Sequence, residues 1–393
     1  MSYDDGAPEL DREKERRFRG MLRQLDSERK AASLIVELML ADTPRHQWAS
    51  IASHPDLQNY GALVYISSLF ERKLTKEPDY ARSLAELGMR IVEALPPNPP
   101  YPKLLAAQMK AHAAKDYGKY LRFIGRQKEA EEIFREAVRM LGGQATLLHD
   151  AAVIRLALAL TLQELEQFDE SLALLAECKS VFRNHGDARN MSIAAFVEGV
   201  LLHRMKQFRE AREAYLLIVA TTPDLDDEQL GALNLSIGLC SIELGDYGAA
   251  QDAFAYAETL FSELDQPMNV LNVELARGRL LIRFGQLTAG VNLLRPVRRQ
   301  FLSHGLREEA GLAGLAIVEG LLGLERHSAA ETLARKIVRE FELAGLNRRA
   351  IAALSFLTQI LASQTASPKN IRDVHEYIVS LRTNPERDFQ LNA

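Results

Sequence analysis

The side chains of this sequence that could do chemistry are scattered and form no known catalytic pattern. Nine histidines occur singly, and no two of them share the spacing of metal ligands on one helix face. The phosphate-binding pattern GxxxxGKS/T, the dinucleotide-binding pattern GxGxxG and the hydrolase patterns HExxH and GxSxG are missing. The sequence therefore predicts a protein that is not an enzyme and that uses no cofactor and no metal.

Two further motifs have simpler explanations than chemistry. Cys178 and Cys240 are too few and too far apart for a disulfide framework or a zinc site, so we interpret them as small apolar packing residues in helices. His54-Pro55-Asp56 matches the tripeptide of J-domain co-chaperones, but the basic helices that flank it in those proteins are missing here. A turn leading into the next helix explains this tripeptide instead.

The composition is that of an ordinary soluble protein. Of 393 residues, 47% are hydrophobic, and Lys plus Arg (48) are outnumbered by Asp plus Glu (53), which gives a net charge of −5. The only basic clusters are short, at 16–19 and 295–299, so a nucleic-acid partner is not expected. The N-terminus MSYDDGAPELDREKE lacks the features of a signal peptide, and no apolar run reaches the roughly 18 residues of a membrane span. We therefore expect a cytoplasmic protein that does not bind a membrane.

The elements that must position any functional side chain are repeated helical hairpins. Four segments share one pattern, namely LRFIGRQKEAEEIFREA, LQELEQFDESLALLAEC, LHRMKQFREAREAYLLI and SIELGDYGAAQDAFAYA. Two weaker copies, LIRFGQLTAGVNLLRPV and LLGLERHSAAETLARKI, follow them. The repeat starts lie near positions 111, 152, 192, 231, 271 and 311, with a partial copy near 351, so the period is about 40 residues.

Four columns of the aligned repeats keep their register. The turn between the two helices of each hairpin holds Gly125, Glu166, Lys206, Gly245, Gly285 and Glu325. Two residues later come Gln127, Phe168, Phe208, Tyr247, Leu287 and His327. A column of small residues follows, with Ala130, Ser171, Ala211, Ala250, Gly290 and Ala330. Near the end of four units stand Phe182, Phe261, Phe301 and Phe341.

These columns resemble the tetratricopeptide repeat (TPR), a helix-turn-helix unit of 34 residues. The family's small residue at the eighth position matches Gly118, Ala159, Gly199, Gly238 and Gly278. A small residue is needed there because the two helices of a hairpin cross closely at that point. Each unit here is about six residues longer than the family's, and the family's Trp near the fourth position is missing. The resemblance implies an all-α, right-handed α-solenoid of helical hairpins.

The rest of the chain divides around the repeats. We expect a disordered tail at 1–9, an N-terminal helical domain at 10–95 and a proline-rich linker at 96–102. The repeats then occupy 103–366, and a capping helix with a tail occupies 367–393. Ser367 and Pro368 suit the start of this last helix, whose apolar stripe would cover the exposed face of the last repeat.

The resemblance also implies which side chains face a partner, because the first helix of each TPR unit lines a concave groove. The positions that carry over and that we select as the binding surface are Lys115, Lys119, Arg122, Leu156, Leu160, Phe196, Val200, His203, Leu235, Leu239 and Arg279.

This predicted groove has two parts. The three basic residues at one end would suit an acidic peptide or a terminal carboxylate, although they could equally be a solvated basic face. The apolar middle would suit an amphipathic helix. Alternatively, the array covers this strip with its own neighbouring repeats or with an N-terminal helix.

The function that best fits these observations is a protein- or peptide-binding scaffold or regulator. An N-terminal helical domain followed by repeats of about 40 residues resembles the layout of bacterial TPR regulators, including the peptide-sensing Rap-type family. That resemblance implies a role in bacterial signalling or transcription. Two alternatives stay open: a self-associating assembly protein, such as a homodimer, and an enzyme with unrecognised catalytic residues.

Overall fold

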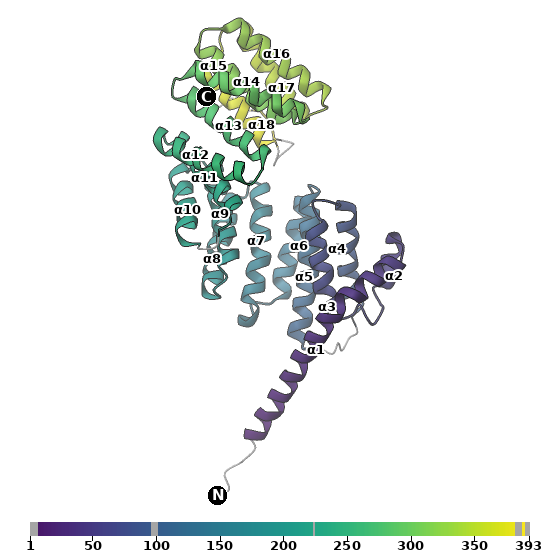
Figure 1. Ribbon diagram of the computed structural model, residues 1–393. Helices are drawn as coiled ribbons and strands as arrows, with labels where there is room; N and C mark the ends of the chain where they lie inside the picture. The colour runs from purple at the N-terminus through teal and green to yellow at the C-terminus, as the bar shows by residue number, and fades with distance from the viewer. Residues whose placement is uncertain (1–6, 96–100, 223–224, 382–386, 390–393) are drawn as a thin grey trace. The chain divides into compact units, whose positions relative to one another are not determined.

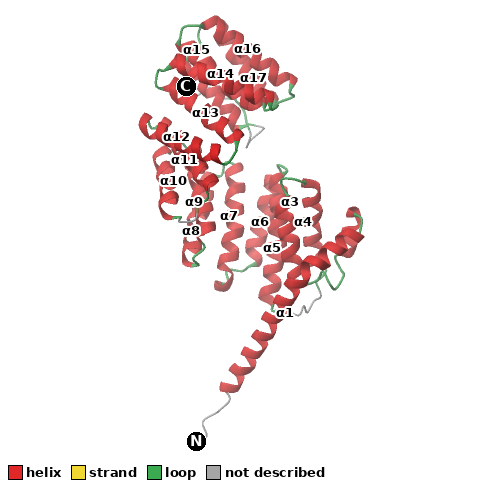
Figure 2. Cartoon of the chain, in the orientation of Figure 1, coloured by secondary structure: helices red, strands yellow, loops and turns green. Residues whose placement is uncertain are grey.

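The structure is entirely helical wherever it is described. The computed structural model describes residues 7–95, 101–222, 225–381 and 387–389. In these ranges every regular element is a helix, and within each of the two compact units named below neighbouring helices pack as hairpins, as Figures 1 and 2 show. The all-α solenoid that the sequence predicts is therefore confirmed. By its internal contacts the chain forms two compact units, Met1–Asn190 and Met191–Ala393.

The first unit contains the N-terminal helices and the first two repeats. Its helices are α1 Ala7–Asp42, η1 Arg45–Gln47, α2 Trp48–Ile51, α3 Tyr60–Lys73, α4 Pro78–Glu93, α5 Lys103–Phe123, α6 Gln127–Met140, η2 Ala145–Leu147, α7 Leu148–Glu164 and α8 Phe168–Asn184. The tripeptide His54-Pro55-Asp56 lies in an exposed turn, closed by a hydrogen bond from the amide of Leu57 to the carbonyl of His54 (2.9 Å). The turn interpretation of this motif is thus confirmed.

The second unit contains the remaining repeats and the C-terminal helix. Its helices are α9 Ala188–Arg204, α10 Phe208–Thr221, α11 Asp227–Glu243, α12 Tyr247–Glu263, α13 Pro267–Arg283, α14 Leu287–Ser303, α15 Arg307–Gly323, α16 His327–Leu343, α17 Arg348–Ala362 and α18 Pro368–Ser380. The boundary between the units falls in the first turn of α9. From α11 to α16 every helix has 17 residues and three-residue turns separate the helices, so longer helices account for the extra length of each repeat.

The predicted turn column takes up one backbone conformation. Gly125, Gly245 and Gly285 have φ values of 81°, 76° and 82°, and Glu166, Lys206 and Glu325 have values of 60°, 62° and 58°. All six are in the left-handed region, which ends a helix by letting the next amides bond back to its last carbonyls. The residues two positions later each begin the second helix of a hairpin. The turn prediction is therefore confirmed in every repeat.

Glycine at the eighth repeat position is required by close packing inside the hairpin. A Cβ on Gly238 would lie 2.6 Å from Cδ1 of Phe254, and a Cβ on Gly199 would lie 2.8 Å from Cζ of Tyr215. Both rings are fully or almost fully buried and come from the second helix of the same hairpin. The absence of a side chain thus lets one helix rest on an aromatic ring of the other.

Particular bounds can be compared with the predicted domain boundaries. Helix α1 begins at Ala7, before the expected end of a tail at residue 9, and residues 1–6 lie outside the described part. Residues 96–100 of the predicted linker are also outside it, but Tyr101 is buried. The Tyr101 hydroxyl donates to the Glu28 carboxylate (2.8 Å) and accepts from the Tyr60 amide (3.1 Å). The proline-rich segment therefore does not separate two compact units, because α4 and α5 pack together on either side of it.

One stretch of the described chain has the length and composition of a membrane span. It is Ala145–Glu164, with a mean hydropathy of 1.5, and 56% of it is buried inside the protein. Core helices of soluble proteins have the same properties, so this stretch is weak evidence for a membrane.

Candidate functional site

The first helices of the hairpins form the inner side of each unit. We call α3, α5, α7, α9, α11, α13, α15 and α17 the A helices and α4, α6, α8, α10, α12, α14 and α16 the B helices. Consecutive A helices pack on each other from α3 to α7 and from α11 to α15. In the described ranges no two consecutive B helices pack in this way. Because the A helices are the more closely spaced row, they line the concave side, which we call the inner face.

The basic residues predicted at the entrance do lie on one helix of the inner face, but their charges are neutralised. Lys119 contacts Glu71 of α3 (2.5 Å), and Arg122 contacts Glu164 of α7 (3.5 Å). Both acidic partners come from neighbouring A helices, which the pattern of α5 alone could not reveal. The binding of an acidic peptide at this place stays a prediction, and the two ion pairs reduce the positive charge that such a peptide would meet.

Lys115 is buried rather than presented to a partner. Only 8% of the residue is exposed, and its Nζ lies 3.1 Å from Oδ1 of Asp116, which is buried as well. Burial alone would lower the pKa of Lys115, but the negative charges of Asp116 and Glu71 outweigh it and raise that pKa. Lys115 thus stays charged as part of an internal ion pair.

A cavity that the sequence does not predict lies between α3, α4 and α5. Its volume is about 240 Å³, and its walls are mostly apolar, with Ser67, Gln108, His112 and Asp116 as polar lining. His112 bonds to Asp150 of α7 through its Nε2 (2.8 Å). Burial would raise the pKa of Asp150, but the hydrogen bonds from His112 and Gln108 lower it below its ordinary value. Two of the polar residues that line this cavity, Gln108 and His112, are therefore engaged with Asp150.

The apolar positions of the predicted groove are only partly accessible. Leu156 is buried, and Leu160, Phe196, Val200, Leu235 and Leu239 are half-buried. Neighbouring core residues cover much of each one; the Phe196 ring, for example, packs on Tyr215 with 5.6 Å between the ring centroids. This arrangement agrees better with the alternative in which the repeats cover the strip themselves.

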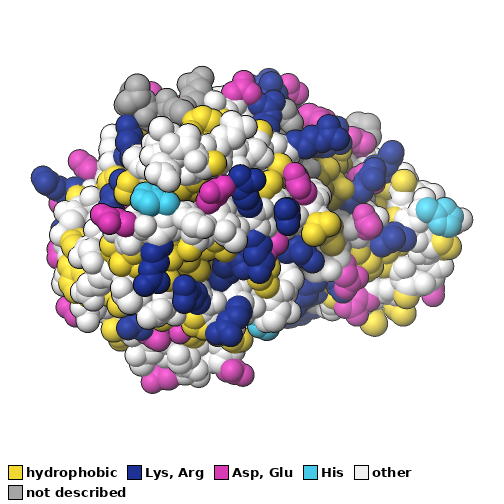
Figure 3. Space-filling view, turned by 90° about the horizontal axis from the view of Figure 1, so that it is seen from above, with side chains coloured by type: hydrophobic (Ala, Val, Ile, Leu, Met, Phe, Trp, Pro, Cys, Tyr) yellow, Lys and Arg dark blue, Asp and Glu magenta, His cyan; other side chains and the backbone are white. Residues whose placement is uncertain are grey.

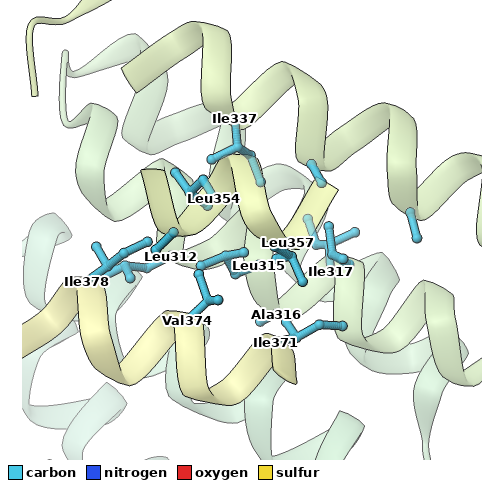
Figure 4. Packing of buried hydrophobic residues seen from close by; sticks show 14 of the residues in the cluster. Leu312, Leu315, Ala316, Ile317, Ile337, Leu354, Leu357, Ile371, Val374 and Ile378 are labelled. Carbon is cyan, nitrogen blue, oxygen red and sulfur yellow. The ribbon is translucent and has the colours of Figure 1, made fainter. Parts of the chain in front are cut away.

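Within the second unit the inner face carries the chain's own C-terminal helix. Ser367 is the N-cap residue of helix α18 and forms a reciprocal capping box with Asn370, and Pro368 stands at the first position of the helix, as predicted. The apolar stripe Ile371, Val374 and Ile378 is buried. Figure 4 shows this stripe directed at residues of α15 and α17.

The position of α18 corrects the expected capping role. The helix contacts α17, the last A helix, but it packs more extensively on α15, one repeat earlier. The buried cluster joins Leu312 and Leu315 of α15 with Leu354 of α17 and with the stripe of α18. Helix α18 therefore folds back over the inner face instead of only closing the end of the array.

Polar contacts flank this docked helix. Arg372 donates to Glu319 of α15 (2.5 Å), and Lys206, in the turn after α9, contacts Glu376 (3.0 Å). Between α18 and the A helices α11, α13 and α15 lies a cavity of about 30 Å³, room for one water molecule. Apart from α18, only A helices line it.

Arg279 and His203, both predicted as groove residues, belong to this polar region. Burial lowers the pKa of Arg279, which lies near Glu243 and Glu319. Burial also lowers the pKa of His203, and the charges of Glu243, Arg279 and Glu376 act on it more weakly. Two groove positions chosen from the sequence thus lie close to the polar side of α18.

Chemical sites of other kinds are not evident in the described ranges. There, no group of three or more His, Cys, Asp or Glu side chains is placed to hold a metal ion. Both cysteines are buried and form no disulfide, the Cys178 thiol donates a hydrogen bond to the carbonyl of Ala152 (3.3 Å), and burial raises the pKa of each thiol to about 12. They pack as small core residues, as the sequence predicted.

Comparison with known proteins identifies the fold. No protein-family model matches the chain, and no curated protein matches it. Among solved structures, a signal-transduction ATPase with a tetratricopeptide-repeat sensor from Pyrococcus horikoshii superimposes with a TM-score of 0.58 at 13% identity. The match covers 90% of this chain and 52% of that protein, so the chain spans about half of its length.

Two further structures are similar. Aspartyl phosphate phosphatase F from Bacillus subtilis gives a TM-score of 0.53 at 10% identity, with 71% of this chain and 70% of that one covered. The quorum sensor NprR from B. thuringiensis, in its apo form, gives a TM-score of 0.50 at 12% identity. The match covers 82% of this chain and 99% of that one. Together with the repeat columns and their turns, these similarities show that the chain has the tetratricopeptide-repeat fold, an all-α solenoid of helical hairpins.

Proposed function

We propose that this chain is a non-enzymatic, protein-binding scaffold or regulator whose inner face binds an amphipathic helix of a partner. The observation that carries the proposal is the docking of α18. An amphipathic helix with apolar residues at positions i, i+3 and i+7 already lies on the A helices of the second unit, held by a buried stripe and flanking ion pairs. The inner face therefore has the shape and chemistry that such a ligand needs.

In this proposal α18 is a built-in competitor. A partner helix would occupy the same surface if it placed three apolar residues on α15 and a basic residue that pairs with Glu319, as Arg372 does. Because α18 is tethered to the array, its effective concentration is high, and the partner has to bind more tightly than α18 to replace it. Partner binding and release of the C-terminal helix are then linked.

The regulatory part of the proposal is motivated by proteins of similar fold that are named as a signal-transduction ATPase and a quorum sensor. We propose a role in bacterial signalling, in the cytoplasm, with a protein or peptide as the ligand. Self-association through the same surface would be a special case, in which α18 of one copy docks on another.

The test uses a fluorescently labelled peptide with the sequence of residues 367–381, added to the full-length chain. In wild type the tethered helix competes with the peptide, so binding is weak. Val374 is fully buried, and Val374→Asp places a charge in the docked stripe, so it releases the helix and opens the surface. We expect the peptide to bind this variant at least about tenfold more tightly than wild type.

The matched control is Val379→Asp, since Val379 lies on the same helix but is 39% exposed. This variant should bind the peptide as weakly as wild type. The proposal fails if the Val374→Asp chain keeps its helical spectrum and cooperative melting yet binds no peptide. It also fails if both variants bind equally well.

A further inference from the structure

A cluster of basic side chains in the second unit remains unexplained by the docked helix. It lies where α14, α15 and α16 meet, around an open hollow of about 1170 Å³. Arg295, Arg298 and Arg299 of α14 line the hollow together with Arg326 and Lys336, and Glu325 is the single acidic residue among its lining. Figure 3 shows a face of the molecule on which Lys and Arg side chains gather beside hydrophobic ones.

The charges of this cluster are not compensated internally. Arg295, Arg299, Arg326 and Lys336 are exposed, and within the described part of the chain none of them makes an ion pair. This differs from the predicted groove entrance, where Lys119 is paired with a carboxylate. Four unpaired positive charges on a protein of net charge −5 form a local field that attracts anions.

Two further features favour an anionic group at this place. Helix α16 begins at the hollow with His327, its N-cap residue Arg326 provides no side-chain cap, and its first turn holds no acidic residue. Its first amide groups are therefore without a capping partner, and the positive end of the helix dipole faces the hollow. Arg298 is buried against Glu340, and its Nε has no hydrogen-bond acceptor.

The floor of the hollow is apolar. Three apolar residues line the bottom of the hollow. Ile317 and Leu321 of α15 are buried, and Leu333 of α16 is half-buried. A ligand that only carried negative charge would leave this floor unused. Nucleic acid is disfavoured, because the lining offers no Phe, Tyr or Trp for base stacking and the whole protein is acidic.

We infer that this hollow, which we call the basic hollow, is a second binding surface and that it takes an acidic protein segment bearing apolar residues. The carboxylates of the segment pair with Arg295, Arg299 and Lys336 and with the start of α16, and its apolar side chains rest on Leu321 and Leu333. The surface is formed by B helices and by one A helix from its outer side, so it is distinct from the docking face of α18.

The experiment uses the full-length chain and a fluorescein-labelled peptide with glutamates throughout and leucines at positions i, i+3, i+4 and i+7. We expect saturable binding that weakens as salt is added, because the contacting charges are exposed. The charge reversal Arg295→Glu/Arg299→Glu should weaken binding at least about tenfold. Both residues are exposed, so the fold should persist.

Three comparisons make the result decisive. The matched control Lys128→Glu/Arg209→Glu reverses two exposed basic residues on other B helices and should change the affinity less than about twofold. A peptide with serine in place of leucine should bind clearly more weakly. The inference is overturned if the two charge-reversal variants lose affinity equally, if the serine peptide binds as well, or if single-stranded DNA binds while the peptide does not.

Discussion

Arg372 of α18 donates a hydrogen bond from Nη1 to Oε1 of Glu319 in α15, at 2.5 Å, although 53 positions of sequence separate the two residues. Glu319 is largely buried and Arg372 is about one-third exposed. The contact lies on the polar edge of the docked helix, next to the buried stripe. It therefore reports directly on whether α18 rests on the inner face.

A double-mutant cycle on this pair should reveal a coupling. We expect Arg372→Ala and Glu319→Ala together to show an interaction free energy of about 1 kcal/mol, because the pair is only partly shielded from water. The exchanged pair Arg372→Glu/Glu319→Arg should recover part of the stability that either single reversal loses. Chemical unfolding of wild type and these six variants measures both quantities, and strictly additive effects of the two alanine substitutions would contradict the contact.

Glycine packing inside the hairpins gives a second prediction. Gly238→Ala places a methyl group against Phe254, and overpacking of this kind costs about 1–3 kcal/mol. Gly248→Ala is the control, since nothing lies within 4 Å of its Cβ position and alanine favours a helix by about 1 kcal/mol. The thermal unfolding midpoint should fall for Gly238→Ala, and it should rise or stay unchanged for Gly248→Ala. Equal shifts would contradict the close approach.

The turn column gives a third prediction. Gly285 has a φ of 82°, so Gly285→Ala should destabilise the repeat by about 1–2 kcal/mol. Glu325 fills the same column with a φ of 58°, so Glu325→Gly removes strain and should be neutral or stabilising by up to about 1 kcal/mol. Denaturant unfolding of both variants measures whether the free energy of unfolding falls for Gly285→Ala and stays or rises for Glu325→Gly. A loss at both positions would show that the two turns are not equivalent.

The turns between the helices of each hairpin were predictable from the sequence. Each turn needs a residue in the left-handed region, and glycine, which this region favours, recurs at the same repeat position as Gly125, Gly245 and Gly285. The eighth-position glycines and the helix starts followed for the same reason. Helix α18 was predicted with its cap and its apolar stripe, since both are local. Its place on α15 was not, because amphipathicity tells which side of a helix is buried but not which helix covers it.

The acidic partners of the predicted groove residues could not be read from the sequence for a related reason. Lys119 and Arg122 share a helix face in the sequence pattern, but Glu71 and Glu164, which neutralise them, come from other helices. The basic cluster at 295–299 was visible in the sequence. The hollow beside it was not, since its floor is built by α15 and α16.

The pKa of His203 predicts a dependence of stability on pH. Burial holds this pKa below the ordinary 6.5, so the unfolded chain takes up a proton at a pH where the folded chain does not. The folded state should therefore lose stability as the pH falls below about 6.5.

His203→Gln should remove this contribution. The measurement is the change in urea midpoint between about pH 7.5 and about pH 5.5, which should be smaller in the variant than in wild type. The charged side chains that act on the ring are Glu243, Arg279 and Glu376. The ring also packs on Phe208, with 5.1 Å between the two ring centroids. All four of these residues are left unchanged in both chains. An unchanged difference would show that His203 has an ordinary pKa.

The most direct test of the account is amide hydrogen exchange on the full-length chain, followed at residues 371–378 of α18 and along α15. Docking predicts protection of α18 comparable with that of α15, and Val374→Asp should remove it from α18 while the remaining repeats stay protected. Exchange of α18 in wild type at the rate of an unstructured peptide, beside a protected α15, would contradict the claim that the inner face holds a helix.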